Sequence, residues 1–334
     1  MIKKLLRFVV LMTLLVAGWT AYFVLTPLQL PNTPYGFTLK HGSSLRSVAS
    51  QLVEADVLKE PWSFTMLVRV LGKAGELKAG NYYLEANPTP FQLFRMITRG
   101  DVSQSEIALI EGWNFKRMRQ ALDQHEAVRH DSAQLSEQEI LEKIGAHEAL
   151  AEGLFFPDTY YFSSGMSDLD ILRRAYLAMQ KRLASVWAER DPLLPYNAPY
   201  EVLIMASIIE KETGQANERP MIAGVFVNRL RINMRMQTDP TVIYGMGDSF
   251  DGNLRRADLL TDTPYNTYTR FGLPPGPIAM PGWGALQAAV HPATTKALYF
   301  VGKGNGTHKF SNSLEEHNLA VARYQLGRRQ GAQN

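Results

Sequence analysis

EVLIMASIIEKET, at residues 201–213, is the stretch that organises this chain, because it places two carboxylates inside a strongly apolar helix. At about 100° per residue, the large apolar side chains of the stretch gather on one face of the helix. Glu212 lies within roughly 20° of the centre of that face, whereas Glu210 lies roughly 140° from it. We therefore expect Glu212 to point at the protein core and Glu210 to point toward the polar flank.

A carboxyl group in apolar surroundings loses hydration of its charged form, so its pKa rises and it can hold a proton near neutral pH. A general acid needs that property. Glu212 is accordingly the candidate catalytic residue. The alternative interpretation is a structural glutamate at a helix end, paired with a nearby arginine.

The N-terminus carries an uncharged apolar run, FVVLMTLLVAGWTAYFVL at residues 8–25, which is about long enough to cross a bilayer. Lys3, Lys4 and Arg7 precede it and favour a cytoplasmic N-terminus. The run is longer than a typical signal-peptide core and lacks a clean cleavage site. The sequence thus predicts an uncleaved single-pass anchor in the inner (cytoplasmic) membrane and a periplasmic body, with a cleaved signal peptide as the alternative.

Composition excludes several functions. The 334 residues are 46% hydrophobic and 20% charged, as in a globular protein. The formal charge of +3 comes from the three basic residues before the anchor, so residues 27–334 carry 32 charges of each sign, which argues against nucleic-acid binding. The lack of Cys excludes disulfides and zinc-thiolate sites. The His residues show no ligand spacing, and His308 and His317 are expected at the surface or anchoring loops; we predict no metal and no cofactor.

After the anchor, a strand–turn–helix pattern occurs three times, with Ser43 or Ser44 as the expected cap of the first helix. Similar units form LysM modules, which hold amino-sugar polymers, but the same pattern describes α+β domains without a sugar role. We predict a small LysM-like α/β region over residues 30–125, in which the three segments are FTLKHGSSLRSVASQLVEADVL (37–58), AGNYYLEANPTPFQLFRMITRG (79–100) and SEIALIEGWNFKRMRQALDQH (105–125).

The rest of the chain is predicted to be an α+β domain with mostly helical elements. Residues 126–150 are polar and helix-prone, and they are expected to form a solvated helical insertion without chemistry. Asp239-Pro240 is typical of a helix N-cap followed by Pro. A domain over 151–330 is predicted to contain helices over 167–190, 198–213, 219–232 and 283–290, a long Pro/Gly-rich loop before the last of these, a C-terminal hairpin and a capped final helix.

The chain contains no GxSxG elbow, HExxH motif, phosphate loop or dinucleotide fingerprint. What remains is a partly buried acid and a loop dense in Tyr, Asn and Pro, held outside the cytoplasm. This combination suits cleavage of an extracytoplasmic glycan. The candidates for positioning the sugar, beside the acid itself, are Glu210, Gln237, Asp239, Tyr265, Asn266 and Tyr268.

Four ordered motifs carry a family resemblance: ASIIEKET, NRLRINMRMQTDPTVIYGMG, YNTYTRFGLPPGPI and HPA, preceded by FPDTY. Together they resemble the membrane-anchored endolytic murein transglycosylases, the YceG-like family. The likeness includes the anchor, the LysM-like region and the C-terminal half, whereas residues 126–150 match nothing particular. In that family the essential acid is the second Glu of the ExET run, which falls here on Glu212.

The resemblance implies cleavage, without water, of the β-1,4 bond between N-acetylmuramic acid and N-acetylglucosamine in nascent peptidoglycan strands. The product would carry a 1,6-anhydromuramic end, and the cut would terminate strand elongation. Implied partners are the glycan strands, the inner membrane and peptidoglycan synthases (penicillin-binding proteins). Two alternatives remain: a membrane-tethered hydrolase using Asp239 or Glu210 as its second carboxylate, and a non-catalytic glycan-binding scaffold for cell-wall synthesis.

Overall fold

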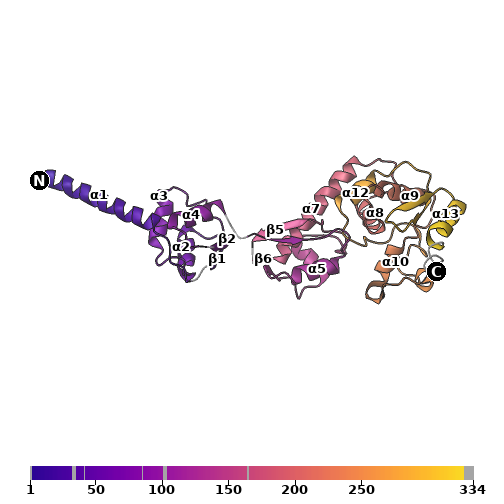
Figure 1. The fold of residues 1–334 in the computed structure, drawn as a ribbon, viewed down its shortest axis with the longest axis horizontal. Helices are drawn as coiled ribbons and strands as arrows, with labels where there is room; N and C mark the ends of the chain where they lie inside the picture. The colour runs from indigo at the N-terminus through magenta and orange to yellow at the C-terminus, as the bar shows by residue number, and fades with distance from the viewer. Residues whose placement is uncertain are drawn as a thin grey trace. The chain divides into compact units, whose positions relative to one another are not determined.

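The computed structural model describes residues 2–31, 35–40, 42–84, 86–100, 104–163 and 165–326, and the chain divides into two compact units (Figure 1). Unit 1 comprises Met1–Glu106 and Tyr161–Met166, and unit 2 comprises Ile107–Tyr160 and Ser167–Asn334. The first division falls inside the predicted 30–125 region. The domain limits taken from the sequence remain predictions, and positions 327–330 of the last one lie outside the described residues.

The chain begins with helix α1, Ile2–Leu25. Among the residues that the structure describes, no helix meets the combined requirements of length and apolar character for crossing a membrane. The anchor over residues 8–25 therefore stays a prediction.

Unit 1 is a two-stranded sheet covered by helices. β1 (Tyr35–Leu39) pairs antiparallel with β2 (Gly80–Leu84) in a register that sets Phe37 opposite Tyr82, and the two rings stack at 5.3 Å. The predicted helix caps are confirmed, because Ser44 accepts from the Ser47 N–H. The helices that complete this core are α2 (Leu45–Glu54), α3 (Trp62–Val70) and α4 (Pro90–Arg99), which bury Leu52, Phe64, Leu93 and Ile97.

Two further short sheets follow, in which β3 (Gln104–Ala108) pairs with β5 (Thr159–Ser163) and β4 (Val128–Arg129) pairs with β6 (Met166–Ser167). The predicted third helix is α5, Phe115–Asp123. Residues 126–150 contain β4 and one helix, α6 (Glu137–Ile144), rather than a continuous helical insertion. A capping box starts α6 at Ser136, and Gly145 ends it in the left-handed conformation (φ 82°).

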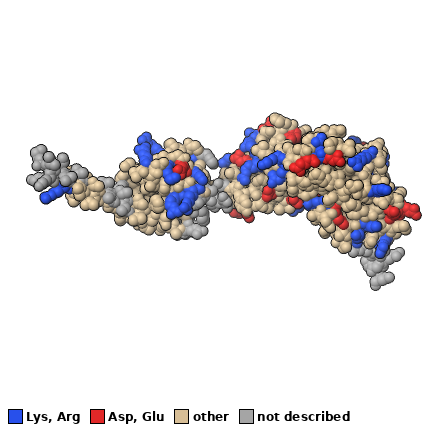
Figure 2. Space-filling model, turned by 90° about the horizontal axis from the view of Figure 1, so that it is seen from above, with Lys and Arg blue, Asp and Glu red and all other residues tan. Residues whose placement is uncertain are grey.

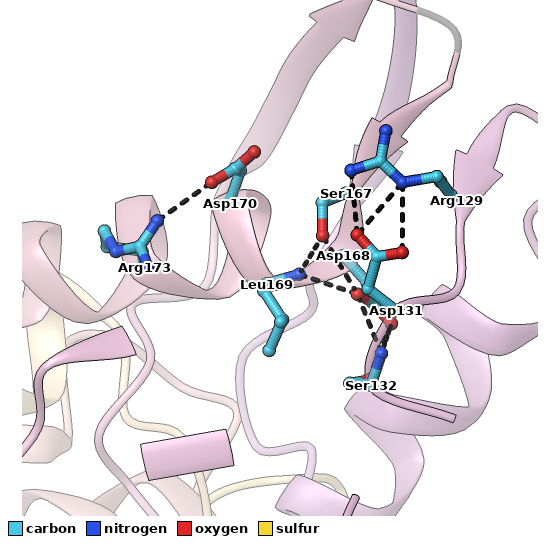
Figure 3. Close-up of polar contacts among 8 residues, drawn as sticks. All are labelled: Arg129, Asp131, Ser132, Ser167, Asp168, Leu169, Asp170 and Arg173. Atoms are coloured by element: carbon cyan, nitrogen blue, oxygen red, sulfur yellow. Dashed lines mark hydrogen bonds and ion pairs between the residues drawn. The ribbon is translucent and has the colours of Figure 1, made fainter. Parts of the chain in front are cut away.

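A buried carboxylate fixes the start of the long helix α7, Asp168–Glu189 (Figure 3). The Asp168 side chain is fully buried and accepts hydrogen bonds from both the N–H and the hydroxyl of Ser132, the latter at 2.6 Å. Arg129 and Asp131 form an ion pair beside it at 2.8 Å. These contacts attach the start of α7 to the segment around β4.

The same aspartate belongs to a group of three possible metal ligands. Asp123, His130 and Asp168 place ligand atoms within 4.8 Å of one another. Both Asp168 oxygens already accept hydrogen bonds from Ser132. We assign no metal ion to this group, because its buried member already has partners.

Helix α8, Pro199–Glu212, is the centre of unit 2. Every residue from Val202 to Ile209 is buried, so the helix is enclosed on all sides and not only on one apolar face. The helices predicted around it are present as α7, α9 (Arg219–Arg231) and α12 (Trp283–Val290), and each of the three packs against α8 or its neighbours. Because the middle of α8 is buried, only its last turn reaches a cavity.

The remaining elements surround the end of α8. α10 (Asp239–Met246) is preceded by Thr238 as its N-cap, so the predicted cap at Asp239 is wrong by one residue. The long loop predicted from the Pro and Gly content lies between α11 (Arg256–Leu260) and α12, and the predicted hairpin is confirmed. The hairpin consists of β7 (Tyr299–Gly302) and β8 (His308–Ser311). The capped α13 (Leu314–Val321) follows it and continues into a π-helical end at Ala322–Leu326. Earlier in the chain, a one-turn helix at 247–249 lies between α10 and α11.

Candidate active site

A cavity of about 400 Å³ opens at the carboxyl end of α8. Segments distant in sequence form its wall: the ends of α8 and α9, the turn before α10, the long loop, the hairpin and α13. The lining residues are Glu212, Arg229, Gln237, Asp239, Tyr268, Tyr299, Phe300, Val301, Gly302, His308, Leu314, His317, Val321 and Gln325.

Glu212 lies in this cavity with a strongly perturbed carboxyl group. Burial raises the pKa of Glu212 from 4.5 to about 7, and the nearby negative charge of Asp239 acts in the same direction. A hydrogen bond donated by the Thr238 hydroxyl opposes the rise, because it stabilises the charged form. The carboxyl group can therefore retain its proton near neutral pH.

Thr238 is held in place by a chain of buried hydroxyl groups. Its N–H donates to the Thr267 hydroxyl at 3.1 Å, and that oxygen lies 2.9 Å from the Thr241 hydroxyl. Thr241 in turn donates to the Thr238 carbonyl at 2.7 Å. Thr238 donates to Oε1 of Glu212, which leaves Oε2 as the oxygen available to carry the proton of the neutral acid.

Three of the predicted sugar-positioning residues line the same cavity as Glu212: Gln237, Asp239 and Tyr268. The Tyr268 hydroxyl donates to Asp239 Oδ1 at 2.5 Å. Gln237 has a left-handed backbone (φ 48°), and its N–H donates to the Thr267 carbonyl at 3.2 Å. Burial and the Asp239 carboxylate raise the pKa of Tyr268, so its hydroxyl stays protonated as a donor.

Glu210 lies outside this cavity and forms a buried ion pair. One carboxylate oxygen is 3.1 Å from Arg219 Nη2, and the other accepts from the Gly282 N–H at 3.0 Å. The side chains of Glu210 and Arg219 are only 6% and 12% exposed. The prediction that Glu210 points toward a polar flank is therefore wrong, because its side chain is enclosed with Arg219. The structural alternative considered for Glu212, a glutamate paired with arginine, thus describes Glu210.

Asn266 and Tyr265 also lie away from this cavity. Asn266 is fully buried, and its Nδ2 donates to three backbone carbonyls, the shortest contact being 2.7 Å to Thr261. Its Oδ1 accepts from the Tyr268 N–H at 2.8 Å. Tyr265 packs against Tyr244 with ring centroids 4.8 Å apart. Both residues shape the long loop, and the structure does not bring them to Glu212.

The structure adds residues that the sequence did not single out. Arg229 is buried, and it donates through Nε to the Leu298 carbonyl at 2.6 Å. His308 and Glu218 lie 2.8 Å apart. His308 on β8 and His317 on α13, which were expected to lie at the surface or to anchor loops, also line the cavity. No local motif marks these residues, because the folding of the hairpin against α9 brings them together.

Comparisons with known proteins identify the family of the chain. The YceG-like family matches residues 37–323 of the chain. The endolytic murein transglycosylase of Bacillus subtilis is 30% identical over 316 residues, which cover 87% of this chain and 85% of that protein. The endolytic murein transglycosylase of Streptococcus pneumoniae is 25% identical over 323 residues, covering 86% of this chain and 57% of that protein.

Among solved structures, the crystal structure of a YceG-like protein from Listeria monocytogenes is similar, with a TM-score of 0.55 and 28% identity. The match covers 85% of this chain and 97% of that one. The family match extends over most of the chain and includes the end of α8, the turn before α10, the long loop and the hairpin. The chain belongs to the YceG-like family.

Proposed function

We propose that this protein is an endolytic lytic transglycosylase of peptidoglycan. It cleaves the β-1,4 bond between N-acetylmuramic acid and N-acetylglucosamine within a strand and leaves a 1,6-anhydromuramic end. One observation supports this proposal most: Glu212, an acid with a pKa of about 7, lies in a cavity of a chain whose relatives carry the name endolytic murein transglycosylase.

The reaction needs one carboxyl group used twice. Protonated Glu212 donates its Oε2 proton to the glycosidic oxygen while the bond from that oxygen to the muramic C1 breaks, leaving an oxocarbenium-like sugar. The resulting carboxylate accepts the proton of the muramic C6 hydroxyl as O6 forms a new bond to C1. Glu212 is then protonated again, and no water is consumed.

A pKa of about 7 suits both halves of this cycle. An acid with the ordinary pKa of 4.5 would be almost fully ionised at neutral pH and could not donate. An acid with a much higher pKa would donate poorly and hold its proton. The Thr238 hydroxyl stabilises the carboxylate that exists between the two steps.

We assign substrate positioning to Gln237, Asp239 and Tyr268, because their side chains line the cavity that contains Glu212. The Asp239–Tyr268 hydrogen bond would fix both groups against the sugar. The contacts of Asn266 indicate that it supports the long loop. The ion pair of Glu210 with Arg219 indicates that Glu210 supports the fold.

Product analysis tests the reaction class. The full chain is incubated with uncrosslinked glycan strands, and the soluble products are identified by mass spectrometry. We expect anhydromuramic ends from the wild type and none from Glu212→Gln. Binding of strands without any cleavage would support a scaffold and refute the transglycosylase.

A hydrolase is the second candidate, because Asp239 supplies a second carboxylate in the same cavity. Glycosidases that hydrolyse need such a partner as nucleophile or water activator. Reducing muramic ends from the wild type, lost in Asp239→Asn, would establish hydrolysis. Anhydromuramic ends that persist in Asp239→Asn would leave Glu212 as the only acid required.

Location and partners form a separate part of the proposal. We propose that residues 1–7 are cytoplasmic, that residues 8–25 anchor the chain in the inner membrane, and that the periplasmic body meets peptidoglycan synthases and terminates strand elongation. The LysM-like region would contribute affinity for glycan. On the face drawn in Figure 2, the Lys and Arg side chains of the larger, C-terminal part are interspersed with Asp and Glu.

Protease treatment of spheroplasts tests the topology. Added protease should degrade the body of the protein while cytoplasmic proteins survive. Survival of the body under conditions that digest known periplasmic domains would refute the predicted orientation.

A further inference from the structure

A second and larger cavity, of about 940 Å³, lies in unit 2. It is formed by the loop before α5, by α5 itself and by α10, and the end of α8 contributes to it. The residues that matter for recognition are Trp113, Lys116, Arg117, Lys211, Glu152 and Asp248. None of these residues takes part in the proposed reaction.

The two cavities are lined by residues that are neighbours in the sequence. Lys211 lines the larger cavity and Glu212 lines the smaller one, and these are consecutive residues of α8. At the start of α10, Pro240 lines the larger cavity and the preceding Asp239 lines the smaller one. An enzyme that cuts inside a polymer must also hold the polymer beyond the bond that it cuts. The larger cavity is therefore placed to receive substrate next to the reacting sugars.

Among the described residues, three cations that line the larger cavity form no ion pair: Arg117, Arg119 and Lys211. Arg119 is half-buried and donates to the Ser132 carbonyl at 3.0 Å, whereas Arg117 and Lys211 are exposed. Arg117 holds its guanidinium 4.7 Å from the centre of the Trp113 ring, which fixes its orientation. Lys211 Nζ donates to the Gly112 carbonyl at 3.3 Å. Among the described residues, no carboxylate lies within ion-pair distance of either side chain. Both can therefore bind an anion from the substrate.

The acids of the same cavity are largely engaged. Asp248 pairs with Lys116 at 2.7 Å. Glu152 is buried, and it accepts from the Phe115 N–H and the Tyr244 hydroxyl, each at 3.2 Å. Glu137 accepts from a backbone N–H at 2.6 Å, which leaves Asp123 at the rim. Among the described residues, Arg117 and Lys211 are thus the exposed cations of this cavity that form no ion pair, and Asp123 is an acid at its rim.

The wall that carries Trp113 is fixed by the backbone. The Gly112 N–H donates to the Met280 carbonyl at 2.9 Å, and the Met280 N–H donates to the Trp113 carbonyl at 2.8 Å. Gly112 has φ 76°, a conformation that favours glycine. Arg117 is thus presented from a rigid loop and the first turns of α5, so little ordering is needed when a ligand binds.

We propose that this second cavity binds the stem peptide of the glycan strand, with Arg117 and Lys211 contacting its free carboxylates. The proposal rests on the proposed function, because it assigns a further part of the same substrate. The sugars of the strand are neutral once the lactyl group is amidated, so the peptide carries the negative charges. One face of Trp113 is covered by Arg117, which disfavours stacking of a sugar on that face.

Substrate selectivity tests this assignment. The full chain is given three sets of strands of equal length: with free stem-peptide carboxylates, with the same carboxylates amidated, and without peptides but with the lactyl carboxyl group capped as a simple amide. We expect the wild type to have the highest kcat/KM on the first set. In Arg117→Gln this preference should fall about tenfold, mainly through KM, because a charge-assisted contact that does not change during the reaction is lost.

Lys211→Gln should reduce the same preference independently of Arg117→Gln. Both side chains are exposed, so neither substitution removes core packing. Arg256→Gln is the matched control, since Arg256 is an exposed cation on α11 that lines neither cavity, and it should keep the wild-type preference. Equal cleavage of all three substrates by the wild type, or an undiminished preference in Arg117→Gln, would overturn the proposal. A lack of anhydromuramic ends from every substrate would instead refute the proposed function.

Discussion

Glu212→Gln should abolish cleavage and at the same time stabilise the protein in a pH-dependent way. In the folded protein the pKa of Glu212 is about 7, above its ordinary value of 4.5. The native state therefore binds more protons than the unfolded state between these values, and the free energy of unfolding falls as pH rises through the window. Glutamine is neutral at every pH and has no such loss.

The size of the effect follows from the pKa. A rise from 4.5 to about 7 corresponds to about 3 kcal/mol at pH 8 and to less than about 1 kcal/mol at pH 5. For a domain of this size, about 3 kcal/mol raises the melting temperature by roughly 6–12 °C. Loss of the proton donor should slow cleavage by about 10²–10⁴-fold.

The assay compares melting temperatures and product yields of the full chain at pH 5 and pH 8. Glu210→Gln is the matched control, because it removes a carboxylate two residues away. Its loss removes the nearer of the two carboxylates beside the half-buried Arg219, whose other partner is Glu111 at 3.7 Å, and should cost about 1–3 kcal/mol, while anhydromuramic ends are still formed. A stabilisation by Glu212→Gln that is equal at the two pH values would refute the burial argument. Unchanged cleavage by that variant would remove Glu212 from the mechanism.

Three further predictions concern the surroundings of the site. Thr238→Val should raise the pKa of Glu212 and shift the alkaline limb of the pH–kcat profile upward by about one unit, whereas Thr238→Ser keeps the hydroxyl and should restore the profile. Asn266→Ala leaves three carbonyls of the loop without their donor, so urea unfolding should show a loss of about 1–3 kcal/mol. Gly224→Ala would put a methyl group 2.6 Å from a backbone carbonyl oxygen and should cost about 1–3 kcal/mol by the same measurement, whereas Gly214→Ala, where nothing lies within 4 Å, should cost far less.

The parts of the fold that depend on local signals could be predicted from the sequence. The apolar content of residues 201–213 indicated α8, and the Gly-rich tip indicated the hairpin of β7 and β8. The helical rotation between Glu210 and Glu212 separated the two acids, which the structure finds in different surroundings. The exact cap of α10 was missed, because the hydroxyl of Thr238 bonds to Glu212 and not to its own helix.

The remaining part of the site depends on contacts between distant segments. Arg229 and His308 reach the cavity only because the hairpin packs beside α9, and nothing in their local sequence reports that packing. Asn266 is the converse case, a residue that the sequence placed at the sugar site and the structure does not. Its residue type and loop suited a sugar contact, but residue type does not determine which way a side chain points, and here it bonds to its own loop.

The composition of unit 1 limits how members of such a family could exchange domains by recombination. Unit 1 is not one continuous segment of the sequence, since it includes Tyr161–Met166 from the middle of the chain. β3, whose residues up to Glu106 belong to unit 1, pairs with β5, whose residues from Tyr161 onward belong to the same unit. A recombination event with a single crossover near residue 106 would bring in a new N-terminal part but leave the old β5 behind. Such a chimera could fold only if a strand from one parent paired with a strand from the other, so viable shuffling would favour parents that already match at this strand pair.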